Sequence, residues 1–134
     1  MPQKILIVED DAINVKFMKV VLTRKGGYEV CVSEDVDEIL QLAAGGDVDA
    51  IIMDISLSRS SYEGQKVDGL FITRLLKSKP ETARVPVVLA TAHAMFGDRE
   101  RFMAETGAEH YISKPIHDPD AFLSEVRHVL PLPE

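Results

Sequence analysis

Five polar residues stand directly behind short apolar runs, and their chemistry is that of a site for a metal ion and a phosphoryl group. Glu9 and Asp10 follow one such run, and Asp54, Thr91 and Lys114 each close another. Because open parallel α/β sheets bind ligands outside the carboxyl ends of their strands, these side chains are expected to gather at one edge of a sheet. Three carboxylates, a hydroxyl and an ammonium would meet there.

The three carboxylates predict a magnesium site. Clustered carboxylates repel one another unless a cation compensates their charge. Mg²⁺ suits this role because it takes hard oxygen ligands and keeps several of its waters. Asp10 and Asp54 are predicted as direct ligands, and Glu9 as a residue that holds a metal-bound water or helps as an acid without contacting the ion. The main-chain carbonyl of Ser56 is predicted to complete the protein's share of the coordination.

The remaining two side chains are predicted to hold the phosphoryl group. Lys114 would bind it as a point charge, and Thr91 would donate its hydroxyl to a phosphate oxygen. Taken singly, each residue has an ordinary structural explanation, since acid pairs after strands often cap helices and a lysine before proline is usually solvated. Single matches of this kind are weak evidence, so the prediction rests on their joint occurrence at successive strand ends.

The elements that must position these residues alternate along the chain. Apolar segments typical of strands covered on both faces are Lys4–Val8, Tyr28–Val32, Ala50–Met53, Val87–Ala90 and His110–Ser113. Segments with helical spacing or helix-end signals are Asn14–Lys25, Val36–Ala44, Leu70–Ser78, Gly97–Thr106 and Asp118–Val129. This order predicts an α/β fold of the (βα)₅ type, a three-layer sandwich around a parallel five-stranded sheet. Residues 1–134 are predicted to form a single domain.

Composition narrows the classes of function. The formal net charge is −7, with 22 acidic and 15 basic residues, which argues against a nucleic-acid partner because such a partner needs a basic face. The single cysteine, Cys31, cannot form an internal disulfide, so the reducing cytoplasm is the expected compartment. No apolar run approaches the length of a membrane span, and no membrane partner is expected.

Four segments resemble the receiver domain of two-component response regulators. They are residues 5–11, with the first strand and acid pair, residues 52–55 around Asp54, residues 89–94 around Thr91, and residues 107–115 around Lys114. The resemblance covers about residues 3–130 and implies a flavodoxin-like fold with strand order 2-1-3-4-5. It also implies that Asp54 is the phosphoacceptor, Thr91 the switch hydroxyl and Lys114 the phosphate-binding lysine.

The resemblance implies a signalling switch and not an enzyme with a separate substrate. Asp54 would accept a phosphoryl group from a phosphohistidine of a histidine kinase or histidine phosphotransfer protein, with Mg²⁺ as cofactor, and would slowly dephosphorylate itself. The motifs are most similar to receivers of phosphorelays and hybrid kinases. A changed face would then bind a downstream protein effector. Tyr111 occupies the position of the family's aromatic switch residue, although a partly buried strand tyrosine is the alternative.

The segment after Asp54 departs from the family pattern. The insertion Leu57–Lys66 makes this loop roughly twice the usual length, and Ser58 stands where a proline is expected. The insertion has no helical or strand period, so it is predicted to be mobile and dispensable for folding. Loop length costs little entropy, and both a functional loop and a tolerated surface insertion remain open.

Other classes of protein share parts of this pattern. A haloacid-dehalogenase-type phosphatase also uses a strand-end Asp with Mg²⁺, but it needs a second Asp two residues further on, where this chain has Ser56. A flavodoxin-type electron carrier needs a hydroxyl-rich phosphate loop after the first strand, where this chain has Glu9, Asp10 and Asp11. A receiver that serves only as an unphosphorylated docking scaffold is the third alternative.

Overall fold

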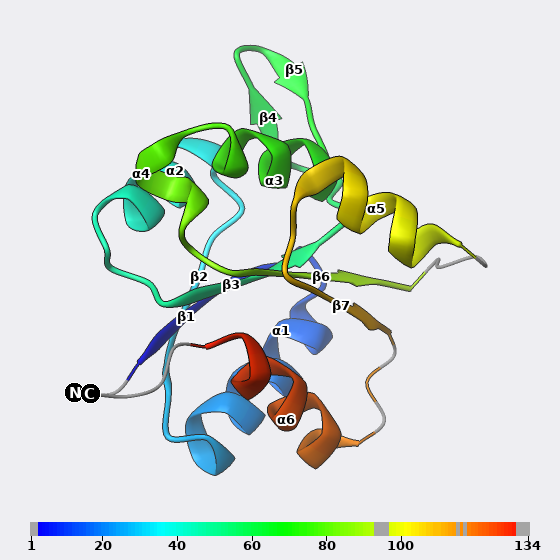
Figure 1. The fold of residues 1–134 in the computed structure, drawn as a ribbon. Coiled ribbons are helices and arrows are strands. Elements are labelled where there is room, and N and C mark those ends of the chain that lie inside the picture. The colour runs from blue at the N-terminus through cyan, green and yellow to red at the C-terminus, as the bar shows by residue number, and fades with distance from the viewer. Residues whose placement is uncertain (1–2, 93–96, 115, 117, 131–134) are drawn as a thin grey trace.

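A parallel sheet forms the middle layer of this computed structural model, which describes residues 3–92, 97–114, 116 and 118–130 (Figure 1). Five strands pair in the order β2-β1-β3-β6-β7. Their bounds are Lys4–Val8 for β1, Glu29–Val32 for β2, Ala50–Asp54 for β3, Val87–Thr91 for β6 and His110–Ser113 for β7. Counted along the chain within this sheet, the order is 2-1-3-4-5, which confirms the predicted flavodoxin-like fold.

Helices cover both faces of the sheet (Figure 1). One face carries α2 (Val36–Ala44), α3 (Gly69–Lys77), the short α4 (Pro80–Ala83) and α5 (Asp98–Thr106). The other face carries α1 (Ala12–Val20), which continues as the π-helical segment η1 (Val21–Lys25), and α6 (Pro119–Val129). The three predicted layers are therefore present.

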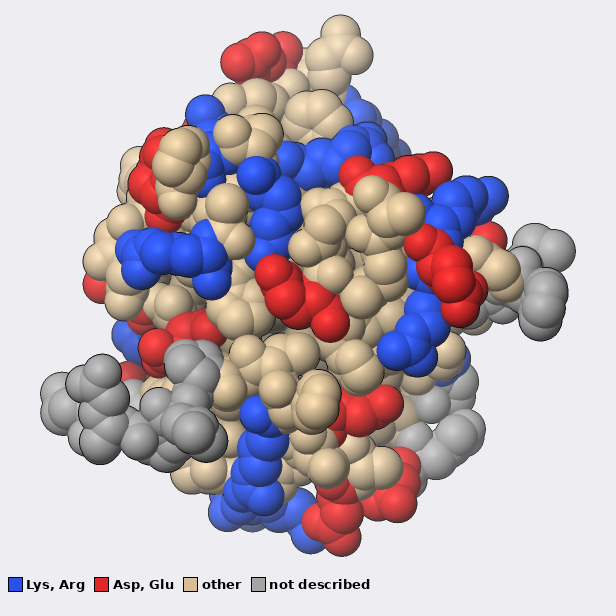
Figure 2. Space-filling view, viewed as in Figure 1, with Lys and Arg blue, Asp and Glu red and all other residues tan. Residues whose placement is uncertain are grey.

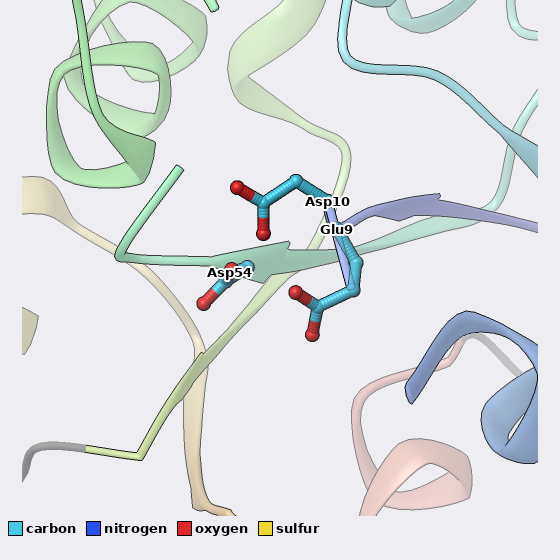
Figure 3. A group of neighbouring side chains, drawn as sticks. All are labelled: Glu9, Asp10 and Asp54. Atoms are coloured by element: carbon cyan, nitrogen blue, oxygen red, sulfur yellow. The ribbon is translucent and has the colours of Figure 1, made fainter. Parts of the chain in front are cut away.

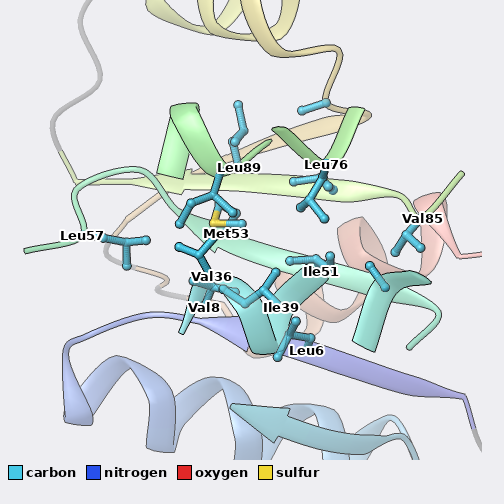
Figure 4. Close-up of a cluster of buried hydrophobic side chains, with 14 of the residues drawn as sticks. Leu6, Val8, Val36, Ile39, Ile51, Met53, Leu57, Leu76, Val85 and Leu89 are labelled. Carbon is cyan, nitrogen blue, oxygen red and sulfur yellow. The ribbon is translucent and has the colours of Figure 1, made fainter. Parts of the chain in front are cut away.

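The alternation of side chains along each strand divides the core into two halves. In β1, Leu6 and Val8 pack toward α2 and α3, whereas Ile5 and Ile7 pack toward α1 and α6. Figure 4 shows the first of these clusters, in which Leu6, Ile51, Met53 and Leu89 come from adjacent strands. Because the five strands are parallel, their carboxyl ends all lie at one edge of the sheet, where such sheets bind ligands.

The predicted bounds of the elements are close, the short α4 was not predicted, and local capping explains the earlier starts of two helices. The first helix begins two residues earlier than predicted because the Asp11 carboxylate accepts hydrogen bonds from the main-chain N–H groups of Ile13 and Asn14. The third helix begins at Gly69, where the Asp68 carboxylate accepts from the N–H of Phe71. Side-chain caps of this kind decide where a helix starts more finely than hydrophobic spacing does.

The insertion contains two short strands that its sequence did not predict, whereas its mobility stays a prediction. Residues Ser61–Tyr62 (β4) and Gln65–Lys66 (β5) pair as an antiparallel hairpin. The turn residues Glu63 and Gly64 have φ values of 53° and 81°, the left-handed conformation that a two-residue hairpin turn of type I′ requires. A hairpin this short gives too few alternating residues for a strand period to be visible in the sequence.

Part of the insertion packs against the core. This packing counts against the prediction that the whole insertion is dispensable for folding, which stays a prediction. Leu57 and Val67 are buried members of the cluster between the sheet and α2 and α3, and Ser60 is buried beside them. The Tyr62 ring lies 6.0 Å, centroid to centroid, from the ring of Phe71 on α3. Leu57 at the start of the insertion and Val67 directly after it thus belong to the packed structure, and the hairpin projects between them (Figure 1).

Charged side chains of both signs are interspersed on the face shown in Figure 2, so the acidic excess is not gathered into one patch there. Among the described residues, no helix has the length and apolar character needed to cross a membrane.

Candidate functional site

Three carboxylates meet where β1 and β3 end side by side. Glu9 and Asp10 directly follow β1, and Asp54 is the last residue of β3. One carboxylate oxygen from each residue lies within 4.8 Å of the others (Figure 3). Within the described part of the chain this is the single cluster of its kind. The carboxylates that the sequence placed at one sheet edge are therefore brought together.

Lys114 bridges two of these carboxylates. Its ammonium donates to Oε1 of Glu9 at 2.8 Å and to Oδ1 of Asp54 at 3.0 Å. The Lys114 side chain is 8% exposed. Burial acts to lower the pKa of Lys114, but the hydrogen bonds to Glu9 and Asp54 outweigh it and leave the pKa raised. The lysine is thus held protonated at the centre of the site, within reach of any group bound to Asp54.

The carboxyl of Glu9 has a raised pKa in this site. Burial raises the pKa of Glu9 to about 7, and the neighbouring Asp54 adds to this effect against the opposing influence of Lys114. Burial therefore disfavours the charged form of Glu9 even with the Lys114 ammonium beside it. A hard divalent cation fits such a set of oxygen donors, which supports the predicted magnesium site.

Asp54 is placed by contacts of both its side chain and its main chain. The N–H of Ser56 donates to Oδ1 of Asp54 at 3.2 Å. At the start of α3, a Cβ on Gly69 would overlap the main-chain oxygen of Asp54, and the Gly69 N–H donates to the carbonyl of Ile55 at 3.0 Å. Gly69 is therefore part of the support of the site, a role that its sequence position after the insertion did not reveal. Ser56 is exposed beside the cluster, and its predicted role as a carbonyl ligand stays a prediction.

Asp10 is held by the insertion. The main-chain N–H and the hydroxyl of Ser58 both donate to Oδ2 of Asp10, at 3.0 and 2.6 Å. These bonds, with the Ser58 hydroxyl first, lower the pKa of the Asp10 carboxyl. The Arg59 guanidinium donates to the main-chain oxygen of Asp10 at 3.0 Å. The sequence showed only that Ser58 replaces an expected proline, and it gave no reason to link this residue to Asp10.

Thr91 and Tyr111 lie on neighbouring strands. Thr91 is the buried last residue of β6, and its carbonyl accepts a hydrogen bond from the N–H of Lys114 at 2.8 Å. Tyr111 is buried in β7, with its ring stacked on Phe102 of α5 at 6.4 Å between centroids. Its hydroxyl has no hydrogen-bond partner among the residues described. Tyr111 is thus more deeply buried than the partly buried strand tyrosine that was the alternative interpretation. Its switch role stays a prediction.

Comparison with known proteins agrees with this fold and site. Residues 5–127 match the response regulator receiver domain family, and the chain belongs to that family. It is therefore the receiver domain of a response regulator, a class of signalling switch.

Similar proteins include the polar-differentiation response regulator DivK of Brucella anthropi, 38% identical over 130 residues that cover 97% of this chain and 98% of the relative. Among solved structures, the receiver domain of a sensor histidine kinase from Pseudomonas aeruginosa superimposes with a TM-score of 0.77 at 29% identity, over 96% of this chain and 98% of that one. That structure has a magnesium ion coordinated in its active-site cleft. The Vibrio cholerae chemotaxis protein CheY4, with a TM-score of 0.79 at 22% identity, covers 97% of this chain and all of its own and shows the same fold.

Proposed function

We propose that this receiver accepts a phosphoryl group on the Asp54 carboxylate from a phosphohistidine of a partner protein. The observation that carries the proposal is the position of Lys114, whose ammonium contacts Oδ1 of Asp54 at 3.0 Å inside a cluster of three carboxylates. A carboxylate oxygen attacks phosphorus, the bond to the partner's histidine nitrogen breaks, and the histidine leaves with the electron pair of that bond. The product on this chain is an aspartyl phosphate.

The residues of the site divide the work of this transfer. Asp10, Asp54 and the main-chain carbonyl of Ser56 would hold Mg²⁺, with Glu9 acting on a metal-bound water. The ion, when bound, supplies positive charge to the phosphoryl oxygens and aligns them for in-line transfer. Lys114, whose ammonium contacts Oδ1 of Asp54 at 3.0 Å, would supply a second positive charge to the phosphoryl group. Positioning and charge compensation are most of what phosphoryl transfer requires, so these residues suffice for the step without a general base.

The same residues would convert the phosphoryl group into a change of shape. The Thr91 hydroxyl donates to a phosphate oxygen and draws the end of β6 toward the site. Tyr111, on the adjacent strand and against α5, would adjust its packing in response. Residues 93–96, which join β6 to the turn before α5, lie outside the described residues. The altered face of β7, α5 and α6 would bind a downstream protein effector.

The acyl phosphate is an anhydride and would hydrolyse slowly, which returns the switch to its resting state. The donors would be histidine kinases or histidine phosphotransfer proteins, as the response regulator family implies, and the reaction is proposed to take place in the cytoplasm. The named function of the Brucella relatives, polar differentiation, is a candidate for the pathway class.

Intact-mass measurement after incubation with acetyl phosphate and Mg²⁺ tests the proposal. The wild-type chain should gain one phosphoryl group, and Asp54→Asn should gain none because an amide is not a nucleophile for this transfer. The exposed Asp47→Asn is the matched control and should be phosphorylated normally. Phosphorylation of Asp54→Asn would move the acceptor elsewhere. A wild-type chain that gains no mass would favour the unphosphorylated docking scaffold.

A further inference from the structure

Ser58 contacts the Asp10 carboxylate from outside the carboxylate cluster. Two donors of one residue, the main-chain N–H at 3.0 Å and the hydroxyl at 2.6 Å, converge on the same oxygen, Oδ2. Two bonds to one oxygen restrict rotation of the carboxylate about its Cβ–Cγ bond. In Figure 3 one oxygen of Asp10 is directed toward Asp54. Hydrogen bonds from surrounding residues orient metal-binding carboxylates in this manner.

The segment that carries Ser58 is itself fixed. Arg59 donates to both carboxylate oxygens of Glu34, at 3.3 and 2.9 Å, in addition to the Asp10 carbonyl. The hydroxyl of the buried Ser60 donates to the main-chain oxygen of Glu34 at 2.8 Å. Leu57 anchors the other side of Ser58 in the core. Ser58 is therefore exposed but held on both sides, so its contact with Asp10 does not depend on a loose loop.

We propose that Ser58 is a positioning residue for Mg²⁺ binding, which it favours by orienting the Asp10 carboxylate. This inference rests on the proposed function, because it assumes that Asp10 binds the metal. A proline at position 58 has neither an N–H group nor a hydroxyl, so a receiver with the expected proline lacks both bonds. In this chain the expected proline is thus replaced by Ser58, which donates directly to the Asp10 carboxylate.

Magnesium titration of the full chain, followed by amide chemical shifts, tests the inference. Ser58→Ala removes the hydroxyl bond and keeps the N–H bond. Its affinity for Mg²⁺ should fall about tenfold, the lower end of the effect of contacts that orient metal ligands, because Ser58 is exposed. Ser58→Thr keeps both donors and should restore most of the affinity. The exposed Ser61→Ala, in the same insertion, should bind Mg²⁺ as the wild type does.

A second measurement separates positioning from a merely structural role. In the reaction with acetyl phosphate, Ser58→Ala should need about tenfold more Mg²⁺ for half of its maximal rate, while the rate at saturating Mg²⁺ stays close to that of the wild type. Asp10→Ala, which removes the proposed ligand itself, gives the upper limit for the increase in the Mg²⁺ that is needed. Equal or higher Mg²⁺ affinity in Ser58→Ala would overturn this inference alone. A wild-type chain that does not bind Mg²⁺ would overturn the proposed function and this inference with it.

Discussion

The Lys114 ammonium donates a hydrogen bond to Oδ1 of Asp54 at 3.0 Å, although the side chains of the two residues are only 8% and 4% exposed. A second bond from the same ammonium reaches Glu9. Removal of one partner from a buried ion pair leaves an uncompensated charge. The lysine therefore stabilises the fold before any metal or phosphoryl group is bound, in addition to its proposed contact with phosphate.

Lys114→Met should lower the stability of the metal-free protein by about 3 kcal/mol at pH 8, because two buried carboxylates lose their cation. Saturating Mg²⁺ should stabilise this variant more than it stabilises the wild type, since the ion then compensates more charge. Urea unfolding in EDTA and in Mg²⁺ measures both effects. Lys77→Met is the control, because Lys77 pairs with Glu109 at 2.8 Å away from the carboxylate cluster. An equal gain from Mg²⁺ in Lys114→Met and the wild type would contradict the expectation.

Glu9 should make the metal-free protein less stable as the pH rises. Its folded-state pKa of about 7 lies above the ordinary value of 4.5, so the folded chain binds more protons than the unfolded chain between these values. Stability must then fall as the pH rises through this range. Glu9→Gln cannot ionise, and in EDTA it should lose less stability than the wild type between pH 5 and about pH 8. The exposed Glu29→Gln should keep the wild-type slope, and equal slopes in all three proteins would contradict the assignment.

Thr91→Ala should separate phosphorylation from the change of shape. Asp54 and the carboxylate cluster remain, so intact mass should still show one added phosphoryl group. The hydroxyl contact at the end of β6 is lost, and amide shifts at Tyr111 and along α5 should change much less on phosphorylation than in the wild type. The half-buried Thr23→Ala, whose hydroxyl bonds within α1 and η1, should respond as the wild type does. A full wild-type response in Thr91→Ala would show that Thr91 does not transmit the signal.

The sequence was most informative about features that depend on the residues of a single strand. Runs such as Ile5–Val8 and Ala50–Met53 predict buried parallel strands, and such strands must end at one edge of the sheet. That is why the close approach of Glu9, Asp10 and Asp54 could be predicted from the sequence. Each residue is placed by its position in a strand, and the strands are placed by a core that is apolar on both faces.

Contacts between distant loops could not be predicted in this way. The bond between Ser58 and Asp10 joins residues 48 positions apart, and neither residue type specifies the other. The hairpin was missed because each of its strands is two residues long, too short for a period to appear. The closest sequence signal was Glu63-Gly64 between polar residues, which resembles the Asp-Gly turns of hairpins. Burial of Tyr111 against Phe102 likewise depends on how α5 lies over β7.

The two parts of the insertion should respond differently to mutation. Leu57 is 6% exposed within the core, so Leu57→Ala should lower the free energy of unfolding by about 2–4 kcal/mol. The hairpin from Ser61 to Lys66 is mostly exposed and contributes less to the core. Urea unfolding should therefore distinguish the base of the insertion from its tip.

A variant without the tip tests the role of the hairpin directly. The N–H of Val67 donates to the carbonyl of Ser60 at 3.1 Å, so a two-residue Asn-Gly turn can join these residues in place of Ser61–Lys66. This variant should fold, bind Mg²⁺ and react with acetyl phosphate as the wild type does, because residues 57–60 are retained. Transfer from protein donors should change, since the hairpin and Glu34 line a cleft beside Arg59. Unchanged transfer rates from several phosphorylated histidine kinases would show that the hairpin is a tolerated surface insertion, and failure to fold would show that its tip is structural.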